Sequence, residues 1–140
     1  MRSSSNDAPI ERIFPHHAPT PRGPYSPAVR AGDFIFVSGQ GPIDPVTDKV
    51  WPGDIRHQTE LTLKNIRRIL ESCGATPADV VKCSVFLRDA QEFRQMNEVY
   101  AQFFGDNRPA RTTVEAKFHD PEMRVEIDCV AYAPKNVTGR

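Results

Sequence analysis

Two amphipathic stretches, each ended by a glycine and followed by a β-rich run, constrain the fold more than any other feature. Between Ile55 and Cys73 the apolar side chains recur at spacings of three and four, and Gly74 follows. Residues 90–104 keep the same period, and Gly105 comes next. This spacing places apolar side chains on one side of a helix, and glycine is common just past a helix end. The sequence therefore predicts two helices that each bury one face.

The β-rich runs surround these helices in a fixed order. Residues 28–40 read as two short strands around the turn at Gly32-Asp33, whereas residues 41–54 are punctuated by Pro and Gly and read mainly as loop. Further strands are predicted over 79–89, 111–117 and 124–132, so the order is β-β-α-β-α-β-β. The first of these should turn one face to the core, through Val81, Cys83, Val85 and Leu87.

This order predicts an α+β fold, a single mixed β-sheet with two helices packed on one face. No segment remains to cover the other face of the sheet, which predicts an oligomer that packs sheet against sheet. The length of 140 residues fits one domain. We expect a flexible N-terminal tail over 1–20, the domain over 21–134 and a short C-terminal tail over 135–140.

Composition narrows the class of protein. The chain has 18 Lys and Arg against 18 Asp and Glu, and this zero net charge argues against nucleic acid or an anionic membrane as the main partner. The N-terminus has no apolar run long enough for a signal peptide or membrane span. The three cysteines include no C-x-x-C pair, and Cys83 and Cys129 fall in step with core positions. We therefore expect free thiols and a cytoplasmic location.

The last two predicted strands carry charged side chains that a plain core strand would not need. Side chains alternate across a strand, so Arg111 and Thr113 share one face, and Glu126 points away from the apolar face of its strand. One interpretation is structural: in a hairpin, Arg111 would lie opposite Asp128 and form a cross-strand ion pair. The other is a binding or catalytic site. Periodicity alone leaves both open.

Four stretches match a known family in order and spacing. They are "RGPYSPAV", "FIFVSGQGPID", "NEVYAQFFGDNRPARTTVE" and "RVEIDCVAY". Together they resemble the reactive-intermediate imine deaminase family, RidA or YjgF, from about Arg22 to Ala133. The resemblance implies a chorismate mutase-like fold, a homotrimer with active clefts between subunits, and last two strands that are not hairpin neighbours.

The resemblance also implies a reaction and its residues. Members with this arginine hydrolyse imines and enamines such as 2-aminoacrylate to 2-oxo acids and ammonia, without metal or organic cofactor. By resemblance, Arg111 holds the substrate carboxylate and Glu126 orients the attacking water. Tyr25 would form a pocket wall, and weaker candidates for substrate binding are Thr113, Asn97, Ser38 and Gln40. Departures from the family are Gly41 and the loop "AKFHDPEMR", where His119 and Asp120 could reshape the pocket rim.

Other functions stay open at this point. A non-catalytic trimer that binds 2-oxo or amino acids for regulation would also use Arg111. A pathway-specific deaminase of aminoacrylate or aminomuconate type would use the same residues. An endoribonuclease, an activity attributed to some relatives, is disfavoured by the zero net charge and by the lack of a basic stripe with interleaved aromatics.

Overall fold

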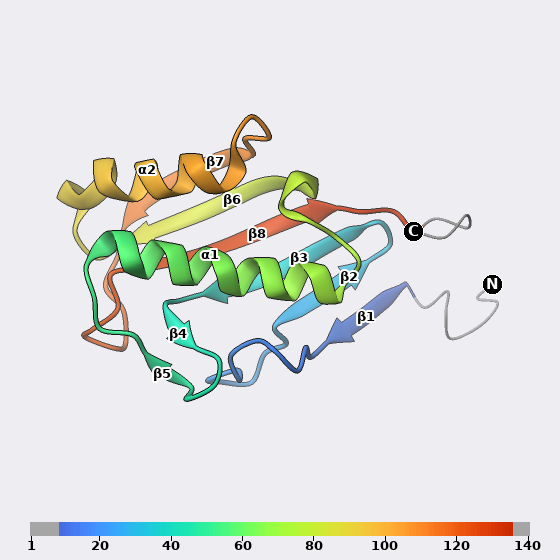
Figure 1. The fold of residues 1–140 in the computed structure, drawn as a ribbon. Coiled ribbons are helices and arrows are strands. Elements are labelled where there is room, and N and C mark those ends of the chain that lie inside the picture. Colours follow the sequence, from blue (N-terminus) through green and yellow to red (C-terminus); the bar gives the residue numbers. More distant parts are fainter. Residues whose placement is uncertain (1–8, 136–140) are drawn as a thin grey trace.

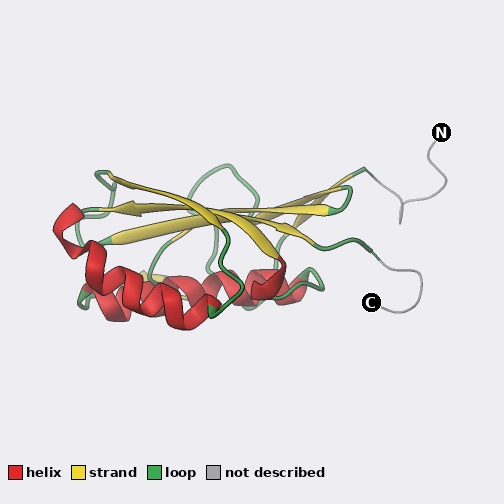
Figure 2. Cartoon of the chain, turned by 90° about the horizontal axis from the view of Figure 1, so that it is seen from above, coloured by secondary structure: helices red, strands yellow, loops and turns green. Residues whose placement is uncertain are grey.

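One mixed sheet of six strands forms the framework, and two helices cover one of its faces (Figures 1 and 2). The computed structural model describes residues 9–135. The sheet order is β1-β2-β3-β8-β6-β7, with β6 and β7 parallel and every other neighbouring pair antiparallel. This arrangement confirms the predicted α+β class with two helices on one face.

Apart from β1, the strands of the main sheet follow the predicted runs closely. Their bounds are β1 Ile10–Ile13, β2 Ala28–Ala31, β3 Phe34–Gln40, β6 Val80–Leu87, β7 Ala110–Glu115 and β8 Val125–Tyr132. The loop predicted over 41–54 contains a small separate pair, β4 (Ile43–Asp44) and β5 (Lys49–Val50).

Both helices occupy the predicted segments and end at their glycines. Helix α1 spans Ile55–Ser72, and the Asp54 carboxylate caps it by accepting a hydrogen bond from the His57 N–H at 2.9 Å. Helix α2 spans Phe93–Phe104 after a single 3-10 turn, Ala90–Glu92. Gly74 and Gly105 have φ of 78° and 58°, values that a residue with a side chain rarely adopts.

The core lies between the helices and the central strands β8 and β6. Val125, Ile127 and Cys129 of β8 are buried, as is Cys83 across from Cys129 on β6. Burial raises the pKa of Cys83 to about 11, so this thiol stays protonated at neutral pH. The prediction that both cysteines are core residues is confirmed.

The expected tail over 1–20 is wrong for its second half. Residues Ile10–Ile13 form β1, which pairs with β2 through the register Ile10↔Ala31 to Ile13↔Ala28, and Ala18 is buried. Local sequence carries little sign of β1, because strand pairing is made by backbone N–H and C=O groups, which every residue except proline has. Residues 1–8 and 136–140 lie outside the described residues.

The predicted alternation of the 79–89 strand fails at its start. The register of β6 against β8 shifts between Val80 and Lys82, so Val80 is buried while Val81 is 44% exposed. An irregularity of one residue moves a side chain to the other face. From Cys83 to Leu87 the alternation is as predicted.

The hairpin that would pair Arg111 with Asp128 does not form. Strand β6 lies between β7 and β8, so the two last strands are not neighbours. Asp128 instead accepts a hydrogen bond from the backbone N–H of Ser84 at 3.1 Å. The predicted cross-strand ion pair between Arg111 and Asp128 is thereby excluded, and the strand arrangement implied by the resemblance is confirmed.

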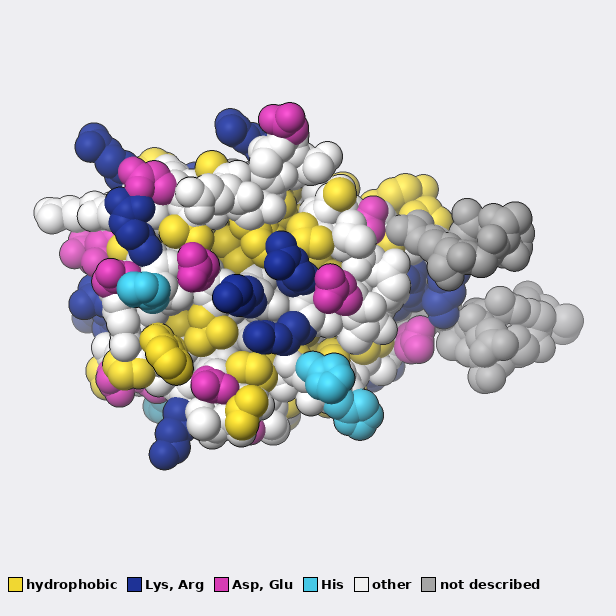
Figure 3. Space-filling view, viewed as in Figure 1, with side chains coloured by type: hydrophobic (Ala, Val, Ile, Leu, Met, Phe, Trp, Pro, Cys, Tyr) yellow, Lys and Arg dark blue, Asp and Glu magenta, His cyan; other side chains and the backbone are white. Residues whose placement is uncertain are grey.

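The second face of the sheet carries no helix (Figure 2). Its strands expose large apolar side chains, with 42% to 47% of Phe34, Phe36, Val114 and Tyr132 accessible. We call this uncovered side of the sheet the open face. The opposite, helical face carries Lys and Arg side chains among apolar ones (Figure 3). Within residues 9–135, no helix combines the length and the apolar character that a membrane span requires.

Candidate active site

A cavity of about 430 Å³ opens on the open face, where β3 and β8 meet the loop 116–124. We call it the Glu126 cavity. Its floor is the sheet, and its walls are the segment around Tyr25 and the loop. The lining residues include Arg22, Tyr25, Gly39, Phe86, Lys117, His119, Asp120, Met123 and Glu126.

Glu126 reaches the cavity because its neighbours on β8, Val125 and Ile127, point into the core. Its carboxylate lies against the backbone of β3: a Cβ built on Gly39 would be 2.3 Å from Oε2 of Glu126. Burial, and then the charge of Asp128, raises the pKa of Glu126 above its usual range. Within residues 9–135 this carboxylate forms no ion pair, so it is free to act on a ligand.

Tyr25, the aromatic pocket wall implied by the resemblance, is among the residues that line this cavity. Its hydroxyl accepts a hydrogen bond from the Arg22 N–H at 3.1 Å. The Arg22 guanidinium in turn donates to the carbonyl of Asp48 at 2.8 Å. These bonds fix the wall while leaving the ring 44% exposed.

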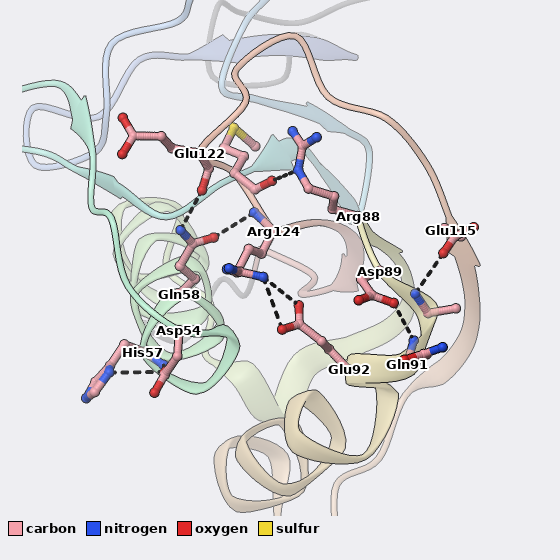
Figure 4. A network of polar contacts seen from close by, with 12 residues as sticks. Asp54, His57, Gln58, Arg88, Asp89, Gln91, Glu92, Glu115, Glu122 and Arg124 are labelled. Carbon is pink, nitrogen blue, oxygen red and sulfur yellow. Dashed lines mark hydrogen bonds and ion pairs between the residues drawn. The ribbon is translucent and has the colours of Figure 1, made fainter.

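The loop 116–124 is held from behind by two side chains (Figure 4). Arg88, which follows β6, donates from Nε to the Met123 carbonyl at 2.6 Å and from Nη2 to the Asp120 carbonyl at 2.7 Å. The buried Gln58 of α1 donates to the Glu122 carbonyl at 2.8 Å and accepts from the Arg124 N–H at 2.7 Å. Backbone bonds of this kind give the cavity a preorganised rim.

Arg111 lies elsewhere, on the helix side of the edge strand β7. Its guanidinium carbon is 4.7 Å from the ring centroid of Tyr100 and 5.6 Å from that of Phe93, and both rings belong to α2. Such stacking steadies a cation without neutralising it. Among the described residues Arg111 forms no ion pair, so its charge is available for an anion.

Asn97 and Thr113 share the sides of α2 and β7 that carry this stacked group. Asn97 falls between Phe93 and Tyr100 on one side of α2, and Thr113 is two residues beyond Arg111 on the same side of β7. Asn97 Oδ1 and Thr113 Oγ1 are both buried with no hydrogen-bond partner in the part of the chain that the structure describes. Buried polar atoms are normally paired, so these two have capacity left for another molecule. We call these residues, with Tyr100, the Arg111 group.

The side chains of Ser38 and Gln40 donate hydrogen bonds to backbone carbonyls near the cavity. Ser38 Oγ donates to the Ser26 carbonyl at 2.6 Å, and Gln40 Nε2 donates to the Ser38 carbonyl at 3.2 Å. Neither side chain lines the Glu126 cavity. Their bonds brace the backbone that carries Tyr25 and Gly39.

The predicted residues thus form two sets on opposite faces of one sheet, Glu126 with Tyr25 and Arg111 with Thr113 and Asn97. Sequence reasoning missed Arg22, Phe86, Lys117 and Met123 as lining residues of the cavity. Phe86 could have been found from alternation, since it shares the face of β6 opposite Cys83 and Val85. In the described residues no three His, Cys, Asp or Glu side chains come together as a metal site.

The chain is similar to known proteins over most of its length. The family model described as Endoribonuclease L-PSP matches residues 15–133. A "RutC family protein" of Pyrococcus horikoshii is 48% identical over 122 residues, 87% of this chain and 97% of its own length. The "3-aminoacrylate deaminase RutC" of Acinetobacter baylyi is 39% identical over 124 residues, 89% of this chain and 98% of its own.

A solved structure and a plant protein are also similar to this chain. The crystal structure of Escherichia coli TdcF with bound serine superposes with a TM-score of 0.81 at 34% identity, over 87% of this chain and 98% of that one. The chloroplastic Reactive Intermediate Deaminase A of Arabidopsis thaliana is 35% identical over 128 residues, 91% of this chain and 68% of its own length.

Proposed function

Since this chain belongs to the RidA family, also called YjgF or RutC, we propose that it is an imine and enamine deaminase. In this proposal it hydrolyses 2-iminopropanoate- and 2-iminobutanoate-type intermediates, 2-aminoacrylate among them, to 2-oxo acids and ammonia. Two relatives with deaminase names support the reaction class. The observation that carries the proposal is the unpaired Glu126 carboxylate, with its raised pKa, beside Tyr25 in a cavity.

The active form in this proposal is a homotrimer with sites between subunits. Two observations support it. The open face exposes Phe34, Phe36 and Tyr132, a kind of apolar surface that marks protein interfaces. In addition, Arg111 and Glu126 lie on opposite faces of the sheet in one chain, so a substrate that touches both needs a second subunit. The Arg111 group of one subunit would close the Glu126 cavity of the next.

Arg111 would bind the substrate carboxylate in this composite site. A guanidinium offers two parallel N–H donors that match the two carboxylate oxygens, which fixes the plane of the C=N bond. Thr113 Oγ1 and Asn97 Oδ1, which lack partners in the described residues, would bond to the substrate nitrogen or to water. Orientation of this kind is a main part of the rate enhancement for a simple hydrolysis.

Glu126 would act as the general base. Water adds to the carbon of the protonated imine while Glu126 takes one of its protons, which gives a 2-amino-2-hydroxy acid. Glu126 then returns the proton to nitrogen, the C–N bond breaks, and the hydroxyl proton departs with the nitrogen as ammonium, leaving the 2-oxo acid. The raised pKa brings the base closer to neutral pH, where proton transfer is most efficient.

A regulator that only binds amino or 2-oxo acids is the second candidate. The bound serine in TdcF favours it, because a relative of this fold holds an amino acid. Glu126 favours the enzyme, since a second negative charge next to a carboxylate ligand would weaken mere binding.

Ammonia release decides between them. A pyridoxal-phosphate serine dehydratase supplies 2-aminoacrylate in the presence or absence of the chain, and the decay of the intermediate is followed with ammonia formation. Accelerated decay supports the deaminase, and binding of serine without acceleration supports the regulator. Running 3-aminoacrylate in parallel separates a general deaminase from a pathway-specific one.

The proposed homotrimer has its own test. Light scattering after gel filtration should give about three times the 15.7 kDa chain mass.

A further inference from the structure

The loop side of the Glu126 cavity carries Arg, Lys and His side chains that the proposed hydrolysis does not use. Arg22, Lys117 and His119 line this cavity together with Glu126. Glu126 projects from the sheet at the floor, whereas Lys117 and His119 belong to the loop at the exposed side. A substrate held over Glu126 would therefore extend toward the loop.

Some of the charged side chains at the loop are already paired with each other. Arg22 pairs with Asp120 at 3.6 Å, and the other Asp120 oxygen accepts the Glu122 N–H at 2.9 Å. That carboxylate is therefore committed to holding the rim. Lys117 lines the same cavity and forms no ion pair with any described residue.

The backbone that presents Lys117 is fixed at both ends. The N–H of Ala116, directly before it, donates to the Leu87 carbonyl at 2.8 Å. Downstream, Arg88 binds the carbonyls of Asp120 and Met123, and its guanidinium lies 5.5 Å from the Phe118 ring centroid. A cation on a fixed backbone can select a ligand, whereas one on a loose loop cannot.

The part of the site that one chain supplies has a volume of about 430 Å³, within the range of roughly 300–1,000 Å³ typical for ligands of drug size. In the proposed oligomer the Arg111 group of the next subunit would occupy some of this volume, and the proposed subsite uses the side formed by the loop.

We propose that Lys117, supported by Arg22 and His119, binds a second anionic group of the substrate. The preferred substrates are then imines and enamines of amino acids with a carboxylate at the far end of the side chain. This inference rests on the proposed function for the reaction, but the anion subsite itself is a separate claim about Lys117. The far carboxylate sits at the loop, away from Glu126, which limits repulsion between the two.

The test uses a matched pair of substrates. An amino acid oxidase generates imines from glutamate and from glutamine, which have the same length but differ in the charge of the side-chain end. The full-length chain should hydrolyse the glutamate-derived imine with a kcat/KM about tenfold or more above that of its amide, as expected for one charge-assisted contact. Lys117→Met should bring this ratio close to one, and Lys117→Glu should invert it.

Lys64→Met, on the exposed side of α1 and outside the cavity, is the matched control and should keep both rates. Equal kcat/KM for the two imines, or an unchanged ratio in Lys117→Met, would overturn the subsite. In that case the hydrolysis itself still stands.

Calorimetric titration tests the subsite even if the chain hydrolyses no imine. If no imine is hydrolysed, but 2-oxoglutarate binds more tightly than its 5-amide and loses that advantage in Lys117→Met, the deaminase proposal fails and the subsite stands. Absence of any such preference in binding and in turnover refutes the subsite whatever the reaction.

Discussion

Arg111 and Glu126 project from opposite faces of one sheet. On β6, which separates their strands, Arg111 is level with Cys83, whose side chain is buried under the helices, and Glu126 is level with Phe86, which lines the open-face cavity. No side-chain rotation brings two such residues onto one substrate within a chain. In the proposed deaminase, a substrate that contacts both residues would therefore lie between two copies of the chain.

Arg111→Ala should abolish useful deaminase activity while the protein stays folded. Loss of a carboxylate-binding guanidinium costs ~2–5 kcal/mol, which corresponds to roughly 30- to 4,000-fold in kcat/KM. Arg111→Lys should also lose most activity, because it keeps the charge but not the planar pair of donors. The measurement is ammonia release from several 2-imino acids, alongside melting temperatures.

The control for Arg111 is Arg108, three residues upstream. Its side chain is exposed and, among residues 9–135, donates one hydrogen bond, to the Gly105 carbonyl at 3.2 Å. Arg108→Ala should leave kcat/KM within about twofold, because surface contacts of this kind contribute little. Wild-type rates in Arg111→Ala would remove Arg111 from the site.

Glu126→Gln should keep substrate binding and slow turnover. The amide is similar in size but cannot accept a proton, and general-base assistance is typically worth ~10²–10⁴-fold in kcat. In the wild type, kcat/KM should fall as pH drops through the raised pKa of Glu126, at a higher pH than for an ordinary carboxyl. A wild-type pH profile in Glu126→Gln would contradict the assignment.

The raised pKa of Glu126 also predicts how the stability of the fold changes with pH. A folded-state pKa raised above the unfolded value means that the folded chain binds the proton more tightly, so stability falls as pH rises through this window. At pH 7 the ionised Glu126 therefore destabilises the fold, and Glu126→Gln should raise the melting temperature. The gain should vanish below the ordinary glutamate pKa of about 4.3, where both states are protonated. Melting curves of both proteins at several pH values measure it, and a lower melting temperature for the variant at pH 7 would contradict the sign.

Gly39→Ala tests whether the glycine exists to admit the carboxylate. The added Cβ would meet Oε2 of Glu126 at 2.3 Å, so the carboxylate must move. A displacement of about 1 Å in a catalytic group can cost ~10²-fold in rate. Gly53→Ala is the control, since Gly53 lies outside the cavity and its Cβ would make an ordinary contact of 3.4 Å with Trp51. We expect kcat to fall far more in Gly39→Ala, and equal losses in both would remove the special role of Gly39.

Local pattern was sufficient to predict the helices and most strand faces. The period of Ile55 to Cys73 and the alternation of Val125, Ile127 and Cys129 are direct consequences of burial on one side. Alternation alone also placed Glu126 off the core face. These features depend only on which side of an element meets the helix layer.

Long-range pairing was not predictable in the same way. Nothing local in β7 or β8 specifies that β6 lies between them, because backbone pairing is nearly independent of sequence. The burial of Gln58 was also missed, because a polar side chain is usually expected to be exposed. Gln58 lies on the apolar stripe of α1 and is fully buried, and its amide forms three hydrogen bonds with backbone groups. A polar residue on an apolar stripe, just after a helix cap, is the signal that could have found it.

Mixing two inactive variants tests the composite site directly. Arg111→Ala retains Glu126, and Glu126→Gln retains Arg111, so each pure oligomer lacks one half of every site. If each site takes Arg111 from one subunit and Glu126 from the next, unfolding and refolding an equal mixture should restore about a quarter of wild-type activity, because ~1 in 4 random subunit contacts of a cyclic oligomer joins two intact halves. If both residues came from the same chain, no mixture could contain an intact site. A mixture of Arg111→Ala with wild type, refolded in the same way, controls for recovery, and light scattering confirms that the mixed species assemble. Activity that stays at the level of the two pure variants, in mixtures shown to have exchanged subunits, would refute a site shared between Arg111 and Glu126 of neighbouring subunits.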